Sequence, residues 1–498
     1  MTSLWANRGT ETLPVTRGRL ADLPRDTLGM MQRLKREHGD IAALVEDDHR
    51  VVFVFSPQYN KQVLNDTRTF HARFFAIRGP KHSAQRRLTS GLLSMNEDQH
   101  KRHRRMLMGP FQRRSFAGYG TSITDLANQM LDSWQPGQVR DIAQDMTQYM
   151  LRVTSTMLFG FDRPELSYRI GESIDRWVGL NHRMGVAAVV PNQDCNDIYE
   201  ELLSFASGLE EQIMEMIRLR RADKNFGEDV LSLLLRTHDE GEGLRDEELI
   251  GHTALLFGAA HLTTAHTLTW TLFLLAQHPS IAKSVHDEVT CVLDGRPPTS
   301  EDFSAMPVVE RVIKESMRVL PSSAYSQRMN VMPVRLGPFQ LPPGTPVMFS
   351  QYMTHHRADL FPAPERFIPD RWKTIAPSPY AYLPFGAGPR MCIGGPLALT
   401  VIKIALPMIL QRYRLTVVPE AEISGNIIST MLTPITPVSM LVSKSDRHFQ
   451  SSPVRGNIHE MVDLVEAPRR RDMRKPPTFL PMQNASPQGF SDLPIPLG

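Results

Sequence analysis

One long stretch without proline constrains the fold more than any other part of the sequence. From Asp246 to Gln277 the chain contains no proline, and it begins with three acidic residues that suit the positive end of a helix dipole. It ends before His278-Pro279, because proline disfavours helix in the residue that precedes it. We therefore predict a single helix about 48 Å long at 1.5 Å per residue, enough to cross a whole domain.

The apolar middle of this stretch, Ala254 to Ala276, is also long enough to suggest a membrane span. It contains His261, His266 and several threonines, which favour a buried core helix instead. The N-terminal residues have no apolar signal-peptide core, so we expect neither a signal peptide nor a membrane anchor. Three cysteines are an odd and sparse number, which fits a reducing compartment, and we expect a cytoplasmic protein.

The remaining hydrophobic pattern predicts a mainly α protein with a minor sheet. Helical patterns cover 99–108, 119–134, 142–158, 199–221, 279–293, 308–319 and 396–412. Strand-like runs cover 41–46, 51–55, 334–336, 347–350 and 438–443.

Size and charge limit the functional class. The chain has 498 residues, with 56 basic and 53 acidic side chains, and this balance argues against a nucleic-acid partner. A chain of this length can enclose a cofactor. We predict one large catalytic domain over residues 1–445 and a C-terminal extension over 446–498. The extension contains eight prolines, and we expect little packed structure from about residue 467.

A glycine-rich loop around Cys392 is the most specific motif. It reads FGAGPRMCIGGPLA over residues 385–398, and a helical pattern follows it directly. Glycines permit tight turns and a close approach of the backbone to a flat ligand. A cysteine at a helix N-terminus has a lowered thiol pKa, and a thiolate ligand on haem iron favours O–O cleavage. Cys195 and Cys291 have no such setting, and we interpret both as structural.

The loop resembles the haem-binding signature of the cytochrome P-450 family. Phe385, Gly388, Arg390, Cys392 and Gly394 occupy its defining positions. The resemblance implies that Cys392 is the iron ligand of haem b (iron protoporphyrin IX) and that Phe385, Arg390 and Gly394 bind this cofactor. It also implies the family's fold, a mainly α prism with a small β-rich lobe.

Further cations resemble the family's haem-propionate ligands. His100 and Arg104 lie four residues apart in a basic helical pattern, and Arg328 matches the family's propionate-binding arginine on a strand. A solvated basic helix is the ordinary alternative for the first two. Three other cations of this pattern are candidates for the face that meets an electron donor: Lys101, Arg102 and Arg105.

A Glu-x-x-Arg pair resembles a structural motif of the same family. Glu315 and Arg318 share one helix face at their i, i+3 spacing. The segment FIPDRW around Arg371 resembles the one that supplies a third charged partner. The resemblance implies a buried network of these three residues that supports the Cys392 loop.

The long helix carries a departure from the family pattern. Its residues 258–264, GAAHLTT, resemble the oxygen-activating stretch, in which Thr263 would guide protons. However, Ala260 replaces the usual glycine and Leu262 replaces the usual acid. We expect His261, Thr263 and Thr264 to act in catalysis, with His261 as a substitute proton donor because its ordinary pKa is about 6.5. The bland alternative is that the threonines bond to their own helix.

The resemblance implies a monooxygenase that hydroxylates an apolar small molecule with O2 and electrons from a ferredoxin or flavodoxin-type donor. Two alternatives stay open: a peroxide-using or non-oxygen-activating haem-thiolate enzyme, suggested by Leu262, and a haem-binding protein without turnover. The substrate class also stays open among fatty acids, terpenoids and polyketides. By resemblance, the pocket is shaped by residues 70–94 and 167–209, which include Phe74, Phe75, Ile77, Met184, Val186 and Val190.

Overall fold

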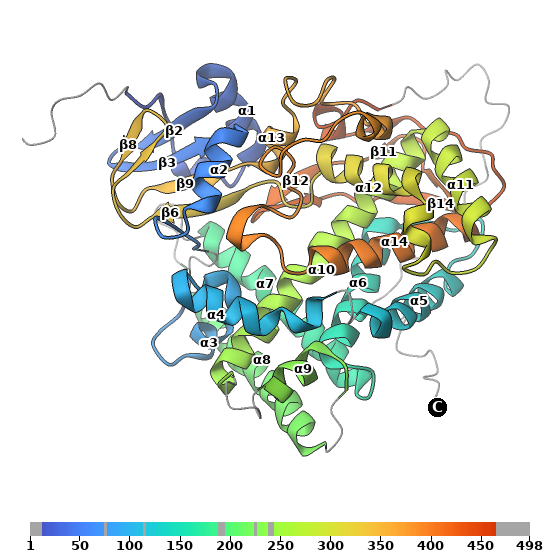
Figure 1. Ribbon diagram of the computed structural model, residues 1–498, viewed down its shortest axis with the longest axis horizontal. Coiled ribbons are helices and arrows are strands. Elements are labelled where there is room, and N and C mark those ends of the chain that lie inside the picture. Colours follow the sequence, from blue (N-terminus) through green and yellow to red (C-terminus); the bar gives the residue numbers. More distant parts are fainter. Residues whose placement is uncertain are drawn as a thin grey trace, which may run out of the picture.

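The computed structural model describes residues 12–73, 77–112, 116–187, 195–223, 227–237 and 244–464. Helices fill most of the molecule, and the largest sheet lies at one side, at the upper left of Figure 1. The predicted mainly α architecture with a small β-rich lobe is therefore confirmed.

The helices follow the predicted pattern closely and add several that the pattern did not show, of which the longest is α7. The bounds are α1 (Thr27–His38), α2 (Pro57–Asn65), α3 (Ala84–Leu88), α4 (Glu97–Leu107), α5 (Phe116–Asp132), α6 (Ile142–Phe159), α7 (Pro164–Ala187), α8 (Asn196–Ala222), α9 (Val230–Thr237), α10 (Asp246–Gln277), α11 (Pro279–Leu293), α12 (Pro307–Val319), α13 (Gln351–His355) and α14 (Gly395–Arg412).

The strands form one larger sheet and several small ones. Their bounds are β1 (Val15–Arg17), β2 (Ile41–Glu46), β3 (His49–Val54), β4 (Phe70–His71), β5 (Val139–Asp141), β6 (Ser326–Asn330), β7 (Val334–Leu336), β8 (Phe339–Leu341), β9 (Pro346–Phe349), β10 (Tyr413–Val417), β11 (Ala421–Glu422), β12 (Gly425–Ile428), β13 (Met431–Pro434), β14 (Ser439–Lys444) and β15 (Val454–Arg455). The larger sheet has the order β1-β2-β3-β9-β6-β4, the order β10-β14-β5 makes a second sheet, and three strand pairs remain, β7-β8, β11-β15 and β12-β13.

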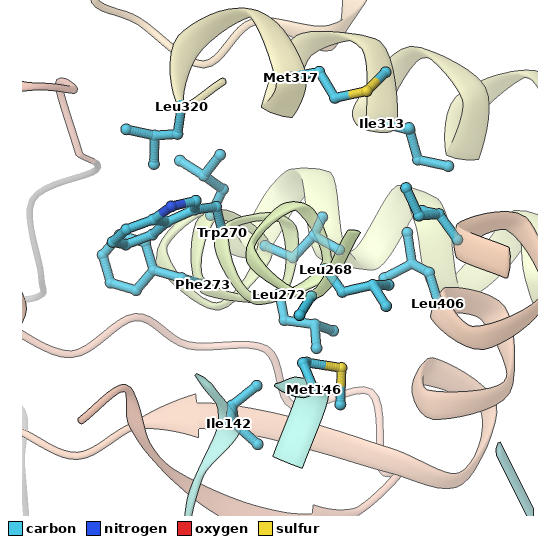
Figure 2. Packing of buried hydrophobic residues seen from close by; sticks show 14 of the residues in the cluster. Ile142, Met146, Leu268, Trp270, Leu272, Phe273, Ile313, Met317, Leu320 and Leu406 are labelled. Carbon is cyan, nitrogen blue, oxygen red and sulfur yellow. The ribbon is translucent and has the colours of Figure 1, made fainter. Parts of the chain in front are cut away.

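Helix α10 runs through the middle of the core. Its first turn is acidic, and the Glu248 carboxylate accepts the Arg245 N–H at 2.9 Å, which caps the helix start. It ends where Pro279 opens α11. Figure 2 shows its apolar side chains surrounded by side chains from α6, α12 and α14. The side chains labelled there include Met146, Leu268, Leu272, Ile313 and Leu406.

One helix of the described chain, α14, is long and apolar enough to cross a membrane. Most of its side chains are buried in the same core as α10, as expected for the central helix of a folded domain. The stretch from Ala254 to Ala276, which raised the same question in the sequence, is the buried part of α10.

The packed chain continues beyond residue 445, where we expected the catalytic domain to end. Residues 446–464, which we call the C-terminal strap, carry β15, and this strand pairs in parallel with β11. Ile458, Met461 and Val462 of the strap are buried in the main hydrophobic core. The strap is therefore part of the folded unit. The segment after about residue 467 lies outside the described residues.

Candidate functional site

The Cys392 loop is a tight turn that leads directly into α14. Gly386 and Gly388 have left-handed backbone angles, with φ values of 66° and 72°. A Cβ atom at Gly388 would lie 2.9 Å from the Leu64 carbonyl oxygen, so the turn requires glycine there. The Cys392 N–H donates to the Phe385 carbonyl at 2.8 Å and closes the turn. The predicted loop before a helix is thus present.

The environment of the Cys392 thiol suits a metal ligand. The thiol is accessible to solvent, yet burial raises its pKa above the ordinary value. Both observations agree when the sulfur faces a hollow inside the protein. The Gly394 and Gly395 N–H groups and the Arg104 cation act in the opposite direction and favour the thiolate. A metal ion at the sulfur would complete this stabilisation, because a coordinated thiol loses its proton.

Three arginines and one histidine from three separate parts of the chain gather near this loop. His100 and Arg104 lie on α4, Arg328 lies on β6, and Arg390 lies two residues before Cys392. Burial and the positive charge of the three arginines lower the pKa of His100 to about 4, so its ring is neutral at pH 7. The structure therefore brings together the four side chains that the sequence suggested for an anionic ligand.

The three arginines keep their charge at neutral pH, although burial lowers the pKa of Arg390 to about 9 and that of Arg328 to about 10. Arg390 donates to the carbonyl groups of Leu93 and Met95. Within the described ranges, no carboxylate lies at ion-pair distance from any of the four cations. Buried positive charge without a counter-charge is unfavourable, so this cluster fits a ligand that carries carboxylates.

Glu315, Arg318 and Arg371 form a buried network, as the Glu-x-x-Arg resemblance implied. Arg318 binds Glu315 in a fork with distances of 3.0 and 2.9 Å, and the Arg371 Nε donates to the same carboxylate at 2.8 Å. Two further groups donate to this carboxylate that the motif did not predict, the Trp372 indole N–H and the Ile368 N–H. The carboxylate accepts five hydrogen bonds in all, so its buried charge is well compensated.

The two arginines of this network also hold the chain segment 355–366. Arg318 donates to the carbonyl groups of His355, Pro364 and Arg366. Arg371 donates to those of residues 362 and 363. The His355 Nε2 in turn accepts the N–H of Leu383, two residues before Phe385. The network thereby supports the segment that leads into the Cys392 loop.

The middle of α10 carries an accessible stretch inside the core. Ala259 and Ala260 are exposed, although Phe257 and His261 beside them are buried. Thr263 is one turn further along on the same side, and its hydroxyl donates to the Ala259 carbonyl at 2.8 Å. Small side chains and the Thr263 hydroxyl therefore share one accessible face of the helix.

His261 is buried on a different face of α10, and the structure does not place it for the expected role as a proton donor. With 3.6 residues per turn, His261 points about 200° away from Ala259. Its Nε2 lies 3.0 Å from the Thr147 carbonyl oxygen on α6, and its Nδ1 lies 3.4 Å from Asp175 on α7. Both ring nitrogens are therefore engaged between helices. Thr264 is buried as well.

A buried histidine pair went unnoticed in the sequence, because the two residues are 149 positions apart. The Leu92 N–H donates to Nδ1 of His252 at 3.2 Å, so a neutral His252 carries its proton on Nε2. That Nε2 lies 3.0 Å from Nδ1 of His103, whose Nε2 faces the Glu248 carboxylate at 3.6 Å. The pair joins α4 and α10 to the turn at Leu92.

Two segments expected to shape the substrate pocket meet at a hollow of about 510 Å³. Ile77 of the first segment lines it, together with Met184, Cys195 and Tyr199 of the second. Phe74, Phe75, Val190 and the Val186 side chain lie outside the described residues. A second hollow, of about 770 Å³, is lined by Phe161 and by residues from α5, α6 and α8 and contains none of the predicted site residues.

Comparison with known proteins identifies the family. The family model of cytochrome P450 matches residues 14–442. The chain belongs to the cytochrome P450 family. Cyclooctat-9-en-7-ol 5-monooxygenase of Streptomyces melanosporofaciens is 33% identical over 394 residues, which cover 77% of this chain and 84% of that protein. Pentalenene oxygenase of Streptomyces avermitilis is 29% identical over 406 residues, covering 80% of this chain and 89% of that protein.

Solved P450 structures share the fold. The haem domain of cytochrome P450DA matches with a TM-score of 0.75 at 23% identity, over 89% of this chain and 99% of that one. The retinoic acid-bound cyanobacterial CYP120A1 matches with a TM-score of 0.74 at 22% identity, over 87% of this chain and all of that one. The predicted family, prism fold and haem cofactor are thereby confirmed.

The chain is a haem-dependent P450 monooxygenase that uses O2, electrons from a redox partner and an apolar substrate. The residues present fit the cofactor. The exposed Cys392 suits the iron, and the cluster of three arginines and His100, which has no acidic partner among the described residues, suits the two propionates of haem.

Proposed function

We propose that this P450 hydroxylates a terpenoid-sized apolar substrate in the cytoplasm, with electrons from a ferredoxin or flavodoxin-type donor. Relatives named for cyclooctat-9-en-7-ol and pentalenene, two hydrocarbon-rich molecules, support this substrate class. The accessible Cys392 thiol beside the uncompensated cations is the observation that carries the haem-thiolate chemistry. Cys291 and Cys392 form no disulfide in the described chain, which suits a reducing compartment.

Each residue around Cys392 has a proposed role. Cys392 binds the iron, and the Gly394 N–H stabilises negative charge on the sulfur. Phe385 packs against Gly395, whose Cβ would lie 3.2 Å from the ring, and shields the sulfur side from water. The cations that hold the propionates are His100, Arg104, Arg328 and Arg390. When bound, haem supplies the electron transfer and oxygen activation that no side chain provides.

On the other side, the chain must orient the substrate and deliver protons. We assign this to the accessible face of α10, where the Thr263 hydroxyl donates a hydrogen bond to the Ala259 carbonyl and, when it turns away from that carbonyl, donates to a water and orients it for proton transfer. Thr264 is a secondary candidate for proton transfer. Leu262 cannot donate, accept or hold a water, so the chain lacks the acid that the family pattern places beside the threonine.

Exposed cations of α4 are the proposed donor-binding face. Lys101, Arg102 and Arg105 are all exposed, whereas His100 and Arg104 of the same helix turn inward. An acidic donor would therefore meet positive charge within one helix diameter of the cofactor-binding cations. Charge reversal at Arg105 should slow reduction by an acidic ferredoxin and leave reduction by dithionite unchanged.

The experiment that tests the proposal combines binding and turnover. The purified holoenzyme is titrated with a panel of terpenoids, fatty acids and polyketides, and the haem spectrum reports displacement of water. The best ligand is then incubated with a reduced ferredoxin system, and products are identified by mass spectrometry. A hydroxylated terpenoid supports the proposal. Tight binding of fatty acids alone, or no product from any bound terpenoid, overturns the substrate assignment.

Peroxide-driven oxidation is a second candidate, favoured by one specific observation. Leu262 removes the usual acid, and His261 is held between α6 and α7 rather than on the accessible face of α10. Proton delivery to reduced oxygen is therefore weakened, whereas hydrogen peroxide already carries the protons that this route must supply. Product formed faster with hydrogen peroxide than with the donor system favours this second function.

A further inference from the structure

The C-terminal strap, residues 446–464, lies beyond the part of the chain that the family model matches. It contacts two places that are distant in sequence, the turn before hairpin β12-β13 and the segment held by the Glu315 network. Its contacts are specific hydrogen bonds as well as buried apolar side chains. Contacts of this kind can hold the two contacted segments in place.

Asn457 makes the most specific of these contacts. Its side-chain amide accepts the Gly425 N–H and donates to the Gly425 carbonyl, both at 2.8 Å, so one side chain satisfies both main-chain groups of the first hairpin residue. Gly456 precedes it with a φ of 103°, and a Cβ there would overlap the Ile423 carbonyl. The Ile423 N–H donates to Arg455 of the strap at 2.8 Å. The strap therefore fixes the start of the hairpin.

The hairpin in turn packs against α10. The Trp270 indole N–H donates to the Leu432 carbonyl at 3.1 Å, and a Cβ at Gly425 would lie 3.4 Å from the same indole ring. At the other end of the hairpin, the Ala324 N–H donates to the Thr430 carbonyl at 2.8 Å. The hairpin is thus held between the strap on one side and α10 with residues 322–324 on the other.

Hydrogen bonds continue from the hairpin to the turn of α10 that bears Thr263. The Leu432 N–H donates to the Ser322 carbonyl at 3.1 Å. The Thr267 hydroxyl lies 3.1 Å from the Ser322 hydroxyl and 2.9 Å from the Thr263 carbonyl, to which it donates. A shift of the hairpin would therefore change the hydrogen bonds of Thr267, one helical turn from Thr263.

The C-terminal end of the strap is hydrogen-bonded to the segment that the Glu315 network holds. The Asp463 N–H donates to the Glu365 carbonyl at 2.9 Å, and the Tyr352 hydroxyl donates to the Met461 carbonyl at 3.3 Å. The neighbouring carbonyl, that of Arg366, is one that Arg318 holds. The strap is therefore attached to a rigid part of the fold and can hold the hairpin in place.

We propose that the C-terminal strap positions hairpin β12-β13 against α10, with Asn457 as the positioning residue, and thereby shapes the substrate side next to Thr263. The positioning of the hairpin is independent of the proposed function. The shaping of the substrate side rests on it, because it takes the Thr263 face of α10 as the place of oxidation.

Hydrogen exchange of the holoenzyme tests the positioning directly. In Asn457→Ala, the amides of residues 425–434 should exchange at least about fivefold faster, because the hairpin start loses both of its side-chain bonds. His448→Ala is the matched control on the same strap, since its ring is 86% exposed and it should change nothing in the hairpin. Unchanged exchange of the hairpin in Asn457→Ala overturns the proposal.

Asn457→Asp keeps the test decisive even where the alanine variant fails to fold. Aspartate still accepts the Gly425 N–H but cannot donate to the Gly425 carbonyl, so the exchange rates should lie between those of wild type and Asn457→Ala. Wild-type exchange rates of the hairpin amides in Asn457→Asp count against the positioning role of the strap, whether or not Asn457→Ala folds. Haem content and the thiolate spectrum should stay at wild-type levels in both folded variants.

Two azole probes of different size test the shaping of the substrate side. Imidazole needs little space, whereas 4-phenylimidazole must also fit its ring beside the pocket wall. Asn457→Ala should weaken 4-phenylimidazole binding by at least about threefold and leave imidazole binding unchanged. If 4-phenylimidazole binds wild type and Asn457→Ala with the same affinity, the proposal that the strap shapes the substrate side is overturned. Failure of the proposed function would look different, because the wild-type protein would then bind both azole probes and still form no hydroxylated terpenoid.

Discussion

Glu315 and Arg371 lie 56 positions apart in the sequence and meet through a hydrogen bond of 2.8 Å in the core. The Glu315 side chain is fully buried, and that of Arg371 is 6% exposed. The same carboxylate binds Arg318, so removal of either arginine leaves buried charge without its partner. From this relationship we predict that the network, although distant from the reacting atoms, is needed for the cofactor loop to form.

The first prediction concerns that network. Arg318→Ala and Arg371→Ala should each lower the free energy of unfolding by about 3–5 kcal/mol, because an uncompensated charge remains buried. Soluble yield and haem content should fall with it. Arg296→Ala is the control, since the Arg296 side chain, which pairs with Asp302, is 51% exposed. Recovery of stable, fully haem-loaded Arg318→Ala protein would contradict this role.

The second prediction concerns the substitution at Leu262. Leu262→Asp should raise the fraction of consumed reductant that appears as oxidised product, because an acid beside Thr263 can relay protons. Thr263→Ala should increase the release of hydrogen peroxide. Thr269→Ala is the control, since Thr269 makes the same kind of helix bond, to Ala265, in a fully buried position. A tightly coupled wild type with no change in Thr263→Ala would refute this account of α10.

The third prediction concerns the histidine pair His103 and His252. Burial lowers the pKa of both rings, that of His252 to about 3, against about 6.5 in an unfolded chain. The nearby negative charge of Glu248 raises the pKa of both histidines. The positive charges of Arg102 and Arg245 lower the pKa of His103. As the pH falls, the unfolded chain binds protons first, so stability is complete above about pH 6.5 and declines below it.

For His252 alone, this loss amounts to about 1.4 kcal/mol per pH unit between pH 6.5 and the folded-state value. His252→Asn should therefore flatten the dependence of the urea midpoint on pH between 5 and 6.5, by about one bound proton. The exposed His448→Ala should leave the slope as in wild type. An unchanged slope in His252→Asn would show that the ring is not held neutral.

The fourth prediction separates the strap from the residues that follow it. A chain that ends after Glu466 should keep its haem spectrum and thermal midpoint, because the composition after Ala467 offers few apolar residues to pack. A chain that ends after Ser445 should lose stability, because Ile458, Met461 and Val462 leave the core. Equal midpoints for the two truncations would contradict the packing of the strap.

Local signals predicted most of the fold. Helix α10 is marked in the sequence by acidic residues at its start and by Pro279 after its end. The glycines around Cys392 predict the turn before α14. Helix α7 was missed, because its polar face hides the apolar period that packs against α8. In these cases the sequence pattern predicted where an element begins or ends, but it did not predict a partly exposed helix.

The features that the sequence could not predict are contacts between residues far apart along the chain. The bonds from Asn457 to Gly425 and from His252 to His103 depend on how separate elements pack, and no spacing along the chain reveals them. The direction of His261 was within reach of helical geometry, because its position is about 200° from Ala259. Its partners Thr147 and Asp175 were not, since they belong to other helices.

The spectrum of the reduced, CO-bound protein tests the central claim, thiolate ligation of haem by Cys392, most directly. Wild type should show the strongly red-shifted Soret band of thiolate ligation, because Cys392 donates electron density to the iron. Cys195→Ser and Cys291→Ser should keep this band, and Cys392→Ser should lose it. A normal red-shifted band in Cys392→Ser, or its absence in haem-loaded wild type, would contradict the account.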